Sequence, residues 1–277
     1  MKLPGSTMAN VGAAMIALLA AIAIGAPRLA PHDPAGAVAA TFGDPGPPSR
    51  AFPLGTDELG RDVLSRIIWG ARISLEVGVA AMAVTMLIGV TIGLLSGFFG
   101  GAIDFLLMRL TDTMLAFPTL LLAMAFVTVM RPSLLTILLV IGLVSWTGVA
   151  RVVRAETLSL RQRDFVLAAR ALGAAPSRLM VAHILPNVVP VIVVMAVLGT
   201  SSTLLLDAGL SFLGLGVPPP TPSWGRMIEE ATIYFRTAPW LALFPGLAIL
   251  YAVLGFNLLG YGYLRRRDAR TSVARSR

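Results

Sequence analysis

Cysteine is absent from this chain of 277 residues, and lysine occurs once, at Lys2. Without cysteine there is no disulfide, no thiolate chemistry and no zinc–sulfur site. A phosphate-binding Walker loop needs a glycine-rich turn that ends in lysine, and Lys2 is the only lysine. The sequence therefore excludes an ATP site of that type. It predicts no catalytic residue and no metal site in this chain.

Histidine is almost as scarce. His32 and His183 lie in different loops, so they cannot share a metal ion or form a catalytic pair. The tripeptide at 209–211, Gly-Leu-Ser, suggests an intramembrane serine protease, but no histidine follows Ser211 as a partner. We therefore set this enzyme class aside.

Charge is also scarce, because only 13% of residues are charged while 56% are hydrophobic. The mean hydropathy is +0.82, far above that of an ordinary soluble domain. Each apolar run comes close to the roughly 20 residues that cross a bilayer as a helix. We predict an all-α, polytopic membrane protein with about six spans: Met8–Ala26, Ile73–Phe98, Phe105–Met130, Leu134–Ala150, Val188–Leu206 and Trp240–Tyr263.

The distribution of basic residues predicts the orientation. If both termini are cytoplasmic, 14 of the 22 basic residues lie inside, in short loops and tails. This is the pattern of the positive-inside rule, so the net charge of +8 mostly reflects topology. No basic soluble domain is present, so we expect the lipid bilayer as a partner and no nucleic acid.

The first run resembles a signal peptide, with Ala23-Ile24-Gly25 as a cleavage site, but Pro27 disfavours cleavage and we expect a retained helix. The chain then divides into four parts. We expect an N-terminal transmembrane helix (1–27), an extracytoplasmic loop with an amphipathic segment (28–72), a permease core of five helices with a cytoplasmic loop at 151–186 (73–264), and a basic cytoplasmic tail (265–277).

The stretch 164–186, DFVLAARALGAAPSRLMVAHILP, is polar and carries arginine between apolar runs. We predict two short helices with a hinge: Asp164 caps the first, and Gly173 supplies the left-handed turn that ends it. Pro176 stands in the first turn of the second helix, and Pro186 interrupts the chain after it. Ala168 and Ala169 would give the first helix a smooth docking face. Arg170 and Arg178 would stay in water as polar docking contacts.

This stretch resembles the coupling loop of permease subunits of binding-protein-dependent ABC importers. That pattern runs Glu-Ala-Ala, three residues, Gly, and about ten residues later Ile/Leu-Pro. The matching residues are Ala168, Ala169, Gly173, Ile184, Leu185 and Pro186. Leu167 replaces the usual glutamate, which removes an ion pair with the ATPase that the resemblance would otherwise imply.

Two further segments resemble the oligopeptide/dipeptide/nickel branch of these permeases. Residues 52–75 contain Leu-Gly-Thr-Asp and Gly-Arg-Asp, and 206–225 contain Leu-Ser-Phe-Leu-Gly-Leu-Gly before a Pro-Ser-Trp-Gly ending. In the first we expect Asp57 to cap an interfacial helix that leads into the second span. In the second, the apolar part is too short to span again, so we expect a re-entrant or outward-facing helix. Asp207 stands where the branch has glutamate.

The resemblance implies the second membrane subunit of a peptide-type importer, with a type I ABC importer permease fold in the cell (inner) membrane. It implies four kinds of partner: a homologous permease subunit, two ATPase subunits that carry the ATP and magnesium, and an extracytoplasmic solute-binding protein. The chain itself would need no cofactor. Its mechanism would be alternating access, driven through residues 164–186. The solute stays open among peptide, nickel chelate, glutathione, opine and sugar.

Residues within the spans have functional and structural interpretations. Asp104, directly before the third run, and Arg109, Asp112 and Pro118 within it are candidates for the pathway or its gating, although paired charges at headgroup level are the simpler explanation. The second run has glycine every four residues, which favours close helix packing: Gly89, Gly93 and Gly97.

A secondary transporter or channel subunit remains the main alternative function. Such a protein is expected to show inverted repeats or a charged relay in mid-membrane. No convincing repeat is present, and the loop at 151–186 would have no purpose.

Overall fold

The computed structural model describes residues 5–39, 43–131 and 133–275, with side chains up to residue 266. Lys2 and Arg277, two of the basic residues counted for the orientation, lie outside the described residues. Within the described part the regular structure is helical, apart from one isolated bridge between Thr56 and Asp62. In chain order the elements are α1 (Gly5–Leu29), α2 (Val63–Phe99), α3 (Gly101–Leu115), α4 (Thr119–Val129), α5 (Leu134–Arg161), α6 (Asp164–Ala171), α7 (Pro176–Arg178), the π-helix η1 (Leu179–Ile184), α8 (Leu185–Phe212), α9 (Trp224–Glu230), the 3₁₀-helix η2 (Ala231–Tyr234) and α10 (Trp240–Arg275).

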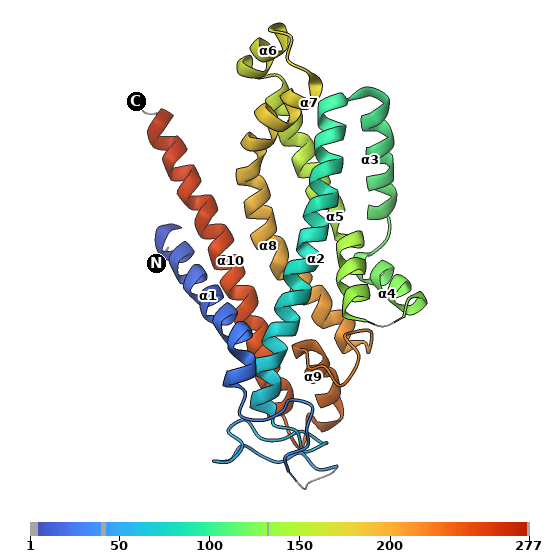
Figure 1. Cartoon of the computed structure of the whole chain (residues 1–277), viewed down its shortest axis with the longest axis vertical. Helices are drawn as coiled ribbons and strands as arrows, with labels where there is room; N and C mark the ends of the chain where they lie inside the picture. Colours follow the sequence, from blue (N-terminus) through green and yellow to red (C-terminus); the bar gives the residue numbers. More distant parts are fainter. Residues whose placement is uncertain (1–4, 40–42, 132, 276–277) are drawn as a thin grey trace.

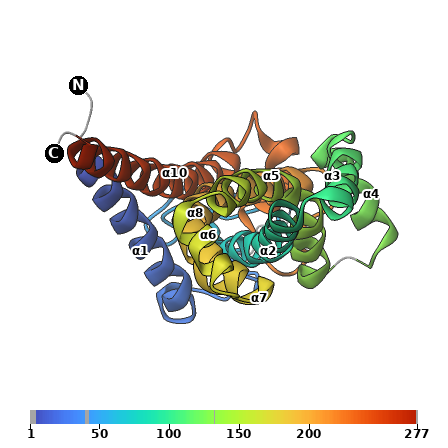
Figure 2. The same ribbon diagram turned by 90° about the horizontal axis from the view of Figure 1, so that it is seen from above.

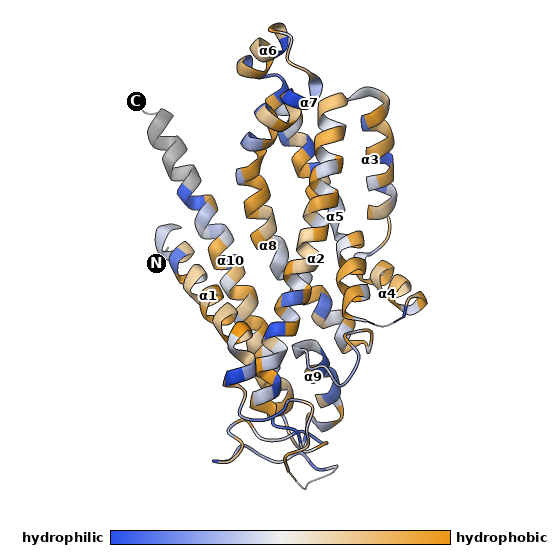
Figure 3. Ribbon diagram, viewed as in Figure 1, coloured by the Kyte–Doolittle hydropathy of each residue, from blue (hydrophilic) through white to orange (hydrophobic). Residues whose placement is uncertain are grey.

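Helices α2, α5 and α8 form the centre of the molecule (Figures 1 and 2). Helices α1 and α10 pack against each other on one side of this centre, and α3 and α4 lie on the opposite side. The short helices α6 and α7 project at one end, which we call the α6 end. The loop before α2 and helix α9 lie at the other end, which we call the α9 end. The polar segments are thus collected at the two ends of an apolar bundle (Figure 3).

Among the residues that the structure describes, five continuous helices are long and apolar enough to cross a membrane: α1, α2, α5, the helix Pro176–Phe212 and α10. The third expected span is broken. Helices α3 and α4 are bent by 86° at Pro118, whose ψ of 124° is extended. A proline lacks the N–H that would continue a helix, so the break falls there. The count of six spans holds when the bent pair is taken as one span.

Two expectations about element boundaries are wrong. Helix α2 begins at Val63, and its N-cap is Asp62, whose side chain accepts a 3.0 Å hydrogen bond from the Ser65 N–H. Asp57 therefore caps no helix, and the supposed interfacial helix is the first part of α2. The segment from Leu206 to Phe212 is not a separate re-entrant helix, because it is the last part of α8.

The three glycines of α2 lie against α5. A Cβ added at Gly93 would stand 2.6 Å from the carbonyl oxygen of Ala150, and the contacts at Gly89 and Gly97 are equally short. All three positions are buried. The absence of side chains lets the two backbones approach closely, and valine and threonine side chains of α5 fill the remaining space.

Candidate functional site

At the α6 end, α6, the turn after it, α7, η1 and the start of α8 (residues 164–186) form a helical hairpin. A complete Schellman motif ends its first helix, α6. The N–H of Ala174 donates to the carbonyl of Ala169 (3.1 Å), and the N–H of Gly173 donates to the carbonyl of Arg170 (3.0 Å). Gly173 has φ +82°, the left-handed conformation that this motif requires. No atom lies within 4 Å of a Cβ built there, so only the backbone conformation requires glycine. Pro176 occupies the first turn of α7.

Three buried side chains fix the hairpin to the bundle. Val166 on α6 and Leu179 and Ile184 on η1 pack in one cluster with Val153 of α5 and Val188 of α8. Each of these residues has at most 2% of its surface exposed. Because buried apolar contacts resist shear, a force on the hairpin is transmitted to α5 and α8. The hairpin can therefore act as a lever on the central helices.

The hairpin exposes both large apolar and basic side chains. Leu172, between α6 and α7, is 90% exposed, and Phe165 and Leu167 are also exposed. Large apolar side chains in a polar segment outside the spans indicate a protein contact surface. The same segment exposes three arginines: Arg163, Arg170 and Arg178. Arg170 and Arg178 thus lie in water, as the sequence indicates.

Three details of the hairpin differ from the sequence prediction. Asp164 is the first residue of α6, and its N-cap is Arg163, which makes no side-chain capping bond. Only Ala168 lies on the exposed surface, because Ala169 packs toward the buried cluster. Pro186 does not interrupt the chain. It stands in the first turn of α8, where the preceding π-helical turn of η1 keeps the helix continuous from Pro176.

Two ion pairs join α3 to α5. The Arg154 guanidinium donates to both carboxylate oxygens of Asp104, from Nε at 2.5 Å and from Nη2 at 2.6 Å, and the Ser96 hydroxyl also donates to Asp104. Arg151 donates to Asp112 at 2.6 Å. The bidentate pair is the stronger, because two parallel charged hydrogen bonds fix its geometry. These pairs hold the first half of the bent span to α5.

Asp112 pairs with Arg151 of α5 and not with Arg109, which stands three residues before it on α3. Arg109 lies over the ring of Phe105 instead, at 5.3 Å from its centroid. The charges of the third run are therefore paired or stacked with neighbours. The simpler explanation, paired charges, describes them, and their role in gating stays a prediction.

A hollow of about 560 Å³ lies between α2, α5 and α8, with the start of α4 at its side. Its wall combines hydroxyl-bearing, apolar and small residues, and none of the lining residues is charged. They are Met82, Thr85, Thr119, Val144, Ser145, Thr147, Gly148, Val149, Met195, Leu198, Gly199, Ser202, Thr203 and Leu206.

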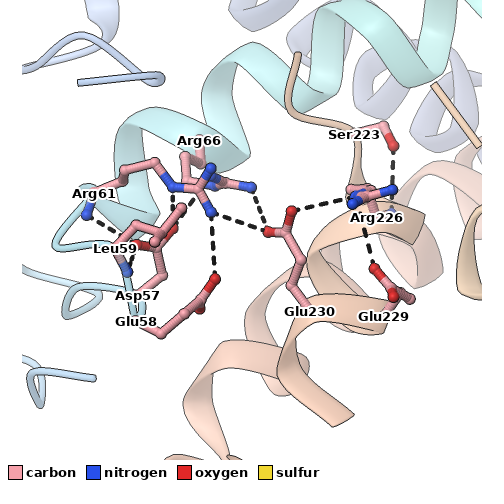
Figure 4. Close-up of polar contacts among 9 residues, drawn as sticks. All are labelled: Asp57, Glu58, Leu59, Arg61, Arg66, Ser223, Arg226, Glu229 and Glu230. Atoms are coloured by element: carbon pink, nitrogen blue, oxygen red, sulfur yellow. Dashed lines mark hydrogen bonds and ion pairs between the residues drawn. The ribbon is translucent and has the colours of Figure 1, made fainter. Parts of the chain in front are cut away.

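A buried network of charges closes the α9 end of the molecule (Figure 4). Glu230 of α9 accepts from Arg66 at 2.6 Å and from Arg61 at 3.3 Å. Asp57 accepts from Arg61 Nε at 2.7 Å and lies 3.2 Å from Arg66. Arg226 donates to the other oxygen of Glu230 at 3.2 Å. The network ties the loop before α2 and the start of α2 to α9.

Three carboxylates of this network, Asp57, Glu58 and Glu230, lie within 4.8 Å of one another. The guanidinium groups of Arg61 and Arg66 already stand among them, so the ion pairs account for the cluster without a metal ion. Burial, with the nearby charges of Asp57 and Glu230 adding to it, raises the pKa of the Glu58 carboxyl above its ordinary value of 4.5.

The chain matches the family described as "Binding-protein-dependent transport system inner membrane component" over residues 89–273. This match includes the hairpin, both ion pairs to α3 and the whole lining of the hollow except Met82 and Thr85. The chain belongs to this family.

The chain is similar to several transport permeases, and the similarity covers most of the length of each. The dipeptide transport system permease protein of Alkalihalophilus pseudofirmus is 40% identical over 274 residues, covering 97% of this chain and 86% of that protein. The di/tripeptide transport system permease protein of Pseudomonas aeruginosa is 43% identical, covering 93% and 86%. The glutathione transport system permease protein of Pectobacterium atrosepticum is 42% identical, covering 92% and 83%. The chain is thus an inner-membrane, multi-pass permease subunit of a binding-protein-dependent ABC importer, and not a subunit of a secondary transporter or channel.

Sequence reasoning missed several residues of this permease. It quoted the segment 52–75, which carries Asp57, Arg61 and Arg66, but it did not bring them together with Glu230, which is 164 residues from Arg66. A sequence signal existed, because charged residues stand directly before and within an apolar helix and need partners there. The exposure of Leu172 and the residues around the hollow had no signal in the sequence.

Proposed function

We propose that the permease imports peptides, or a related small solute, and forms half of the translocation path. Its full set of partners would be a homologous permease subunit, two ATPase subunits and an extracytoplasmic solute-binding protein. The names of the similar proteins support peptides first. Glutathione is the second candidate, because a permease of 42% identity is named for it. Nickel chelates, opines and sugars remain the other candidates.

In this proposal the chain catalyses no reaction and holds no cofactor. ATP and magnesium would bind the ATPase subunits, because the chain has one lysine and no Walker loop. The α6 end would face the cytoplasm together with both termini, and the α9 end would face the solute-binding protein. The arginines concentrated near the α6 end support this orientation.

The hairpin at 164–186 would receive the force. This assignment depends on one observation: the hairpin is anchored in the bundle by buried side chains and exposes a large apolar side chain at its far end. Val166, Leu179 and Ile184 are buried in the bundle, while Leu172 is 90% exposed outside it. An ATPase subunit with an apolar pocket would cover Leu172, and acidic groups at the rim of that pocket would pair with Arg170 and Arg178.

Substitutions of Gly173 test the lever. Gly173→Val should distort the left-handed turn, because a β-branched residue is strained at φ +82°. Gly173→Asn is the matched control, since asparagine tolerates this conformation. In vesicles containing the whole complex, we expect the valine variant to hydrolyse ATP with little uptake and the asparagine variant to retain both. Normal uptake by the valine variant would contradict the lever.

Substitutions of Leu172 test the docking and the orientation. Leu172→Asp should weaken co-purification of the ATPase subunits, whereas Leu172→Met, which keeps an apolar side chain, should not. Neither variant should affect folding, because the side chain at this position is 90% exposed. Leu172→Cys introduces the only thiol of the chain. An impermeant thiol reagent should label it in inside-out vesicles stripped of ATPase subunits. Labelling in right-side-out vesicles would instead place the α6 end outside the cell and contradict the proposed orientation.

A further inference from the structure

The hollow between α2, α5 and α8 lies midway along the length of these helices and is open to the surface of the chain. Met82, Ser145 and Leu198 line it, and each stands near the midpoint of its helix. Its volume of about 560 Å³ falls within the range of small-molecule sites, roughly 300–1,000 Å³. Gly148 adds room, because no atom lies within 4 Å of a Cβ built there. The hollow is thus large enough for a small solute and lies at mid-membrane depth when the helices span.

The wall carries six hydroxyl-bearing residues, and their hydroxyl groups differ in whether they are used within the fold: Thr85, Thr119, Ser145, Thr147, Ser202 and Thr203. The Thr203 hydroxyl donates to the carbonyl of Gly78 at 2.8 Å and the Thr85 hydroxyl donates to that of Gly142 at 3.4 Å, so both serve helix packing. Ser145 and Ser202 line the hollow with surface left uncovered. Their hydroxyls can both donate and accept a hydrogen bond. They can therefore pair with either end of an amide group.

The wall carries no charged side chain. An unpaired charge is costly at mid-membrane depth, and no charged side chain on this wall can pair with it. A solute with amide groups and balanced charge avoids that cost and can bond to the two serines. Methionines at 82 and 195 supply flexible apolar contacts that adapt to different side chains.

We propose that this hollow is the solute-contacting part of the path in this subunit. It favours small amide-bearing solutes without net charge, such as neutral dipeptides, over charged ones, and Ser145 and Ser202 are its hydrogen-bonding residues. This inference rests on the proposed function, since it names the site and the class of solute for the same transport.

Thiol accessibility tests the site. The chain has no cysteine, so Ser202→Cys carries a single thiol in this subunit. In the whole complex in lipid vesicles, we expect a small water-soluble methanethiosulfonate reagent to modify it. Leu87→Cys is the matched control, because Leu87 is 72% exposed on α2 but does not line the hollow. Reaction of both at the same rate, or of Leu87→Cys alone, would overturn the assignment.

A charge placed in the hollow tests the class of solute. Ser202→Asp is compared with Ser202→Asn in the same complex, using uptake of alanyl-alanine, lysyl-lysine and aspartyl-aspartate. We expect the aspartate variant to lower uptake of aspartyl-aspartate at least about tenfold relative to lysyl-lysine, because buried like charges repel. The asparagine variant should keep the wild-type ratios.

The outcomes separate the two proposals. If the aspartate variant hydrolyses ATP and keeps the wild-type ratios among the three peptides, the hollow does not contact the solute, and the proposed function stands. If the wild-type complex takes up none of the three peptides while its ATPase subunits remain active, peptide import itself is wrong, and with it the solute class. A changed ratio in the aspartate variant alone supports both.

Discussion

The charge network at the α9 end offers a quantitative test through Arg66→Met. Arg66 is 2% exposed, and its guanidinium lies 2.6 Å from Glu230 and 3.2 Å from Asp57. Methionine keeps most of the volume of the arginine stem, so the change removes the charge without opening a large cavity. It leaves two largely buried carboxylates, each with one arginine fewer.

The expected cost follows from the burial. Removing one partner of a buried ion pair destabilises a protein by about 3–5 kcal/mol. A loss of 1 kcal/mol lowers the melting temperature of a chain of this size by about 2–4 °C. Arg66→Met should therefore lower the apparent melting temperature by roughly 6–20 °C.

The assay is thermal unfolding of the detergent-solubilised complex, followed by the loss of its size-exclusion peak at one heating rate. The matched control is Arg236→Met, because Arg236 is exposed at the same end of the molecule. Exposed substitutions cost within about 0.5 kcal/mol, which corresponds to about 2 °C or less. Both variants lose one positive charge, so a difference between them reports burial and pairing.

A double-mutant cycle identifies the partner. In the background of Glu230→Gln, Arg66→Met should cost less than in the wild type, because its main partner has already lost its charge. Two results would refute the reasoning: Arg66→Met melting within about 2 °C of Arg236→Met, or an equal cost in both backgrounds.

Three further variants follow from the packing and the charges. Gly93→Leu should destabilise the fold by about 1–3 kcal/mol, because the added side chain drives α2 away from α5. Gly148→Ala should be tolerated, because its Cβ meets no atom within 4 Å. The melting temperatures of the two variants check this. Asp104→Asn should cost about 1–2 kcal/mol, more than Asp112→Asn, because the bidentate pair is the less exposed of the two; equal melting temperatures would contradict it. Burial raises the pKa of Glu58, so its carboxyl stabilises the fold at low pH and this contribution is lost as pH rises above its ordinary value of 4.5. The melting temperature of Glu58→Gln should therefore rise relative to that of the wild type as pH increases above about 4.5, and a relative fall would refute the shift.

The sequence predicted those features that depend on neighbouring residues. The apolar runs located every helix that is long enough to span, because a helix satisfies its own backbone hydrogen bonds and only its length and composition matter. Gly173 was identified as the left-handed residue because that conformation favours glycine wherever the chain goes next. Residues 164–186 do contain a short helix, a turn and the start of a second helix, but the prediction that the second helix is short is wrong, because it continues to Phe212.

Local rules failed where two signals compete within a few residues. Asp57 and Asp62 both suit an N-cap, and the choice of Asp62 follows from Asp57 pairing with Arg61 and Arg66 in the buried network. Pro186 is a helix breaker by propensity, yet the π-helical turn before it keeps the helix continuous.

The chain alone, then, determined an apolar helical bundle with a basic hairpin, because helix formation, membrane insertion and the left-handed turn are set by residues close in sequence. Only the tertiary structure decided that Arg66 meets Glu230, that Arg154 holds Asp104, and that three helix midpoints line an open, uncharged hollow. These features join residues far apart in the sequence, and their partners are chosen by burial: a charge or a hydroxyl removed from water is stable only beside the group that the packed fold brings to it.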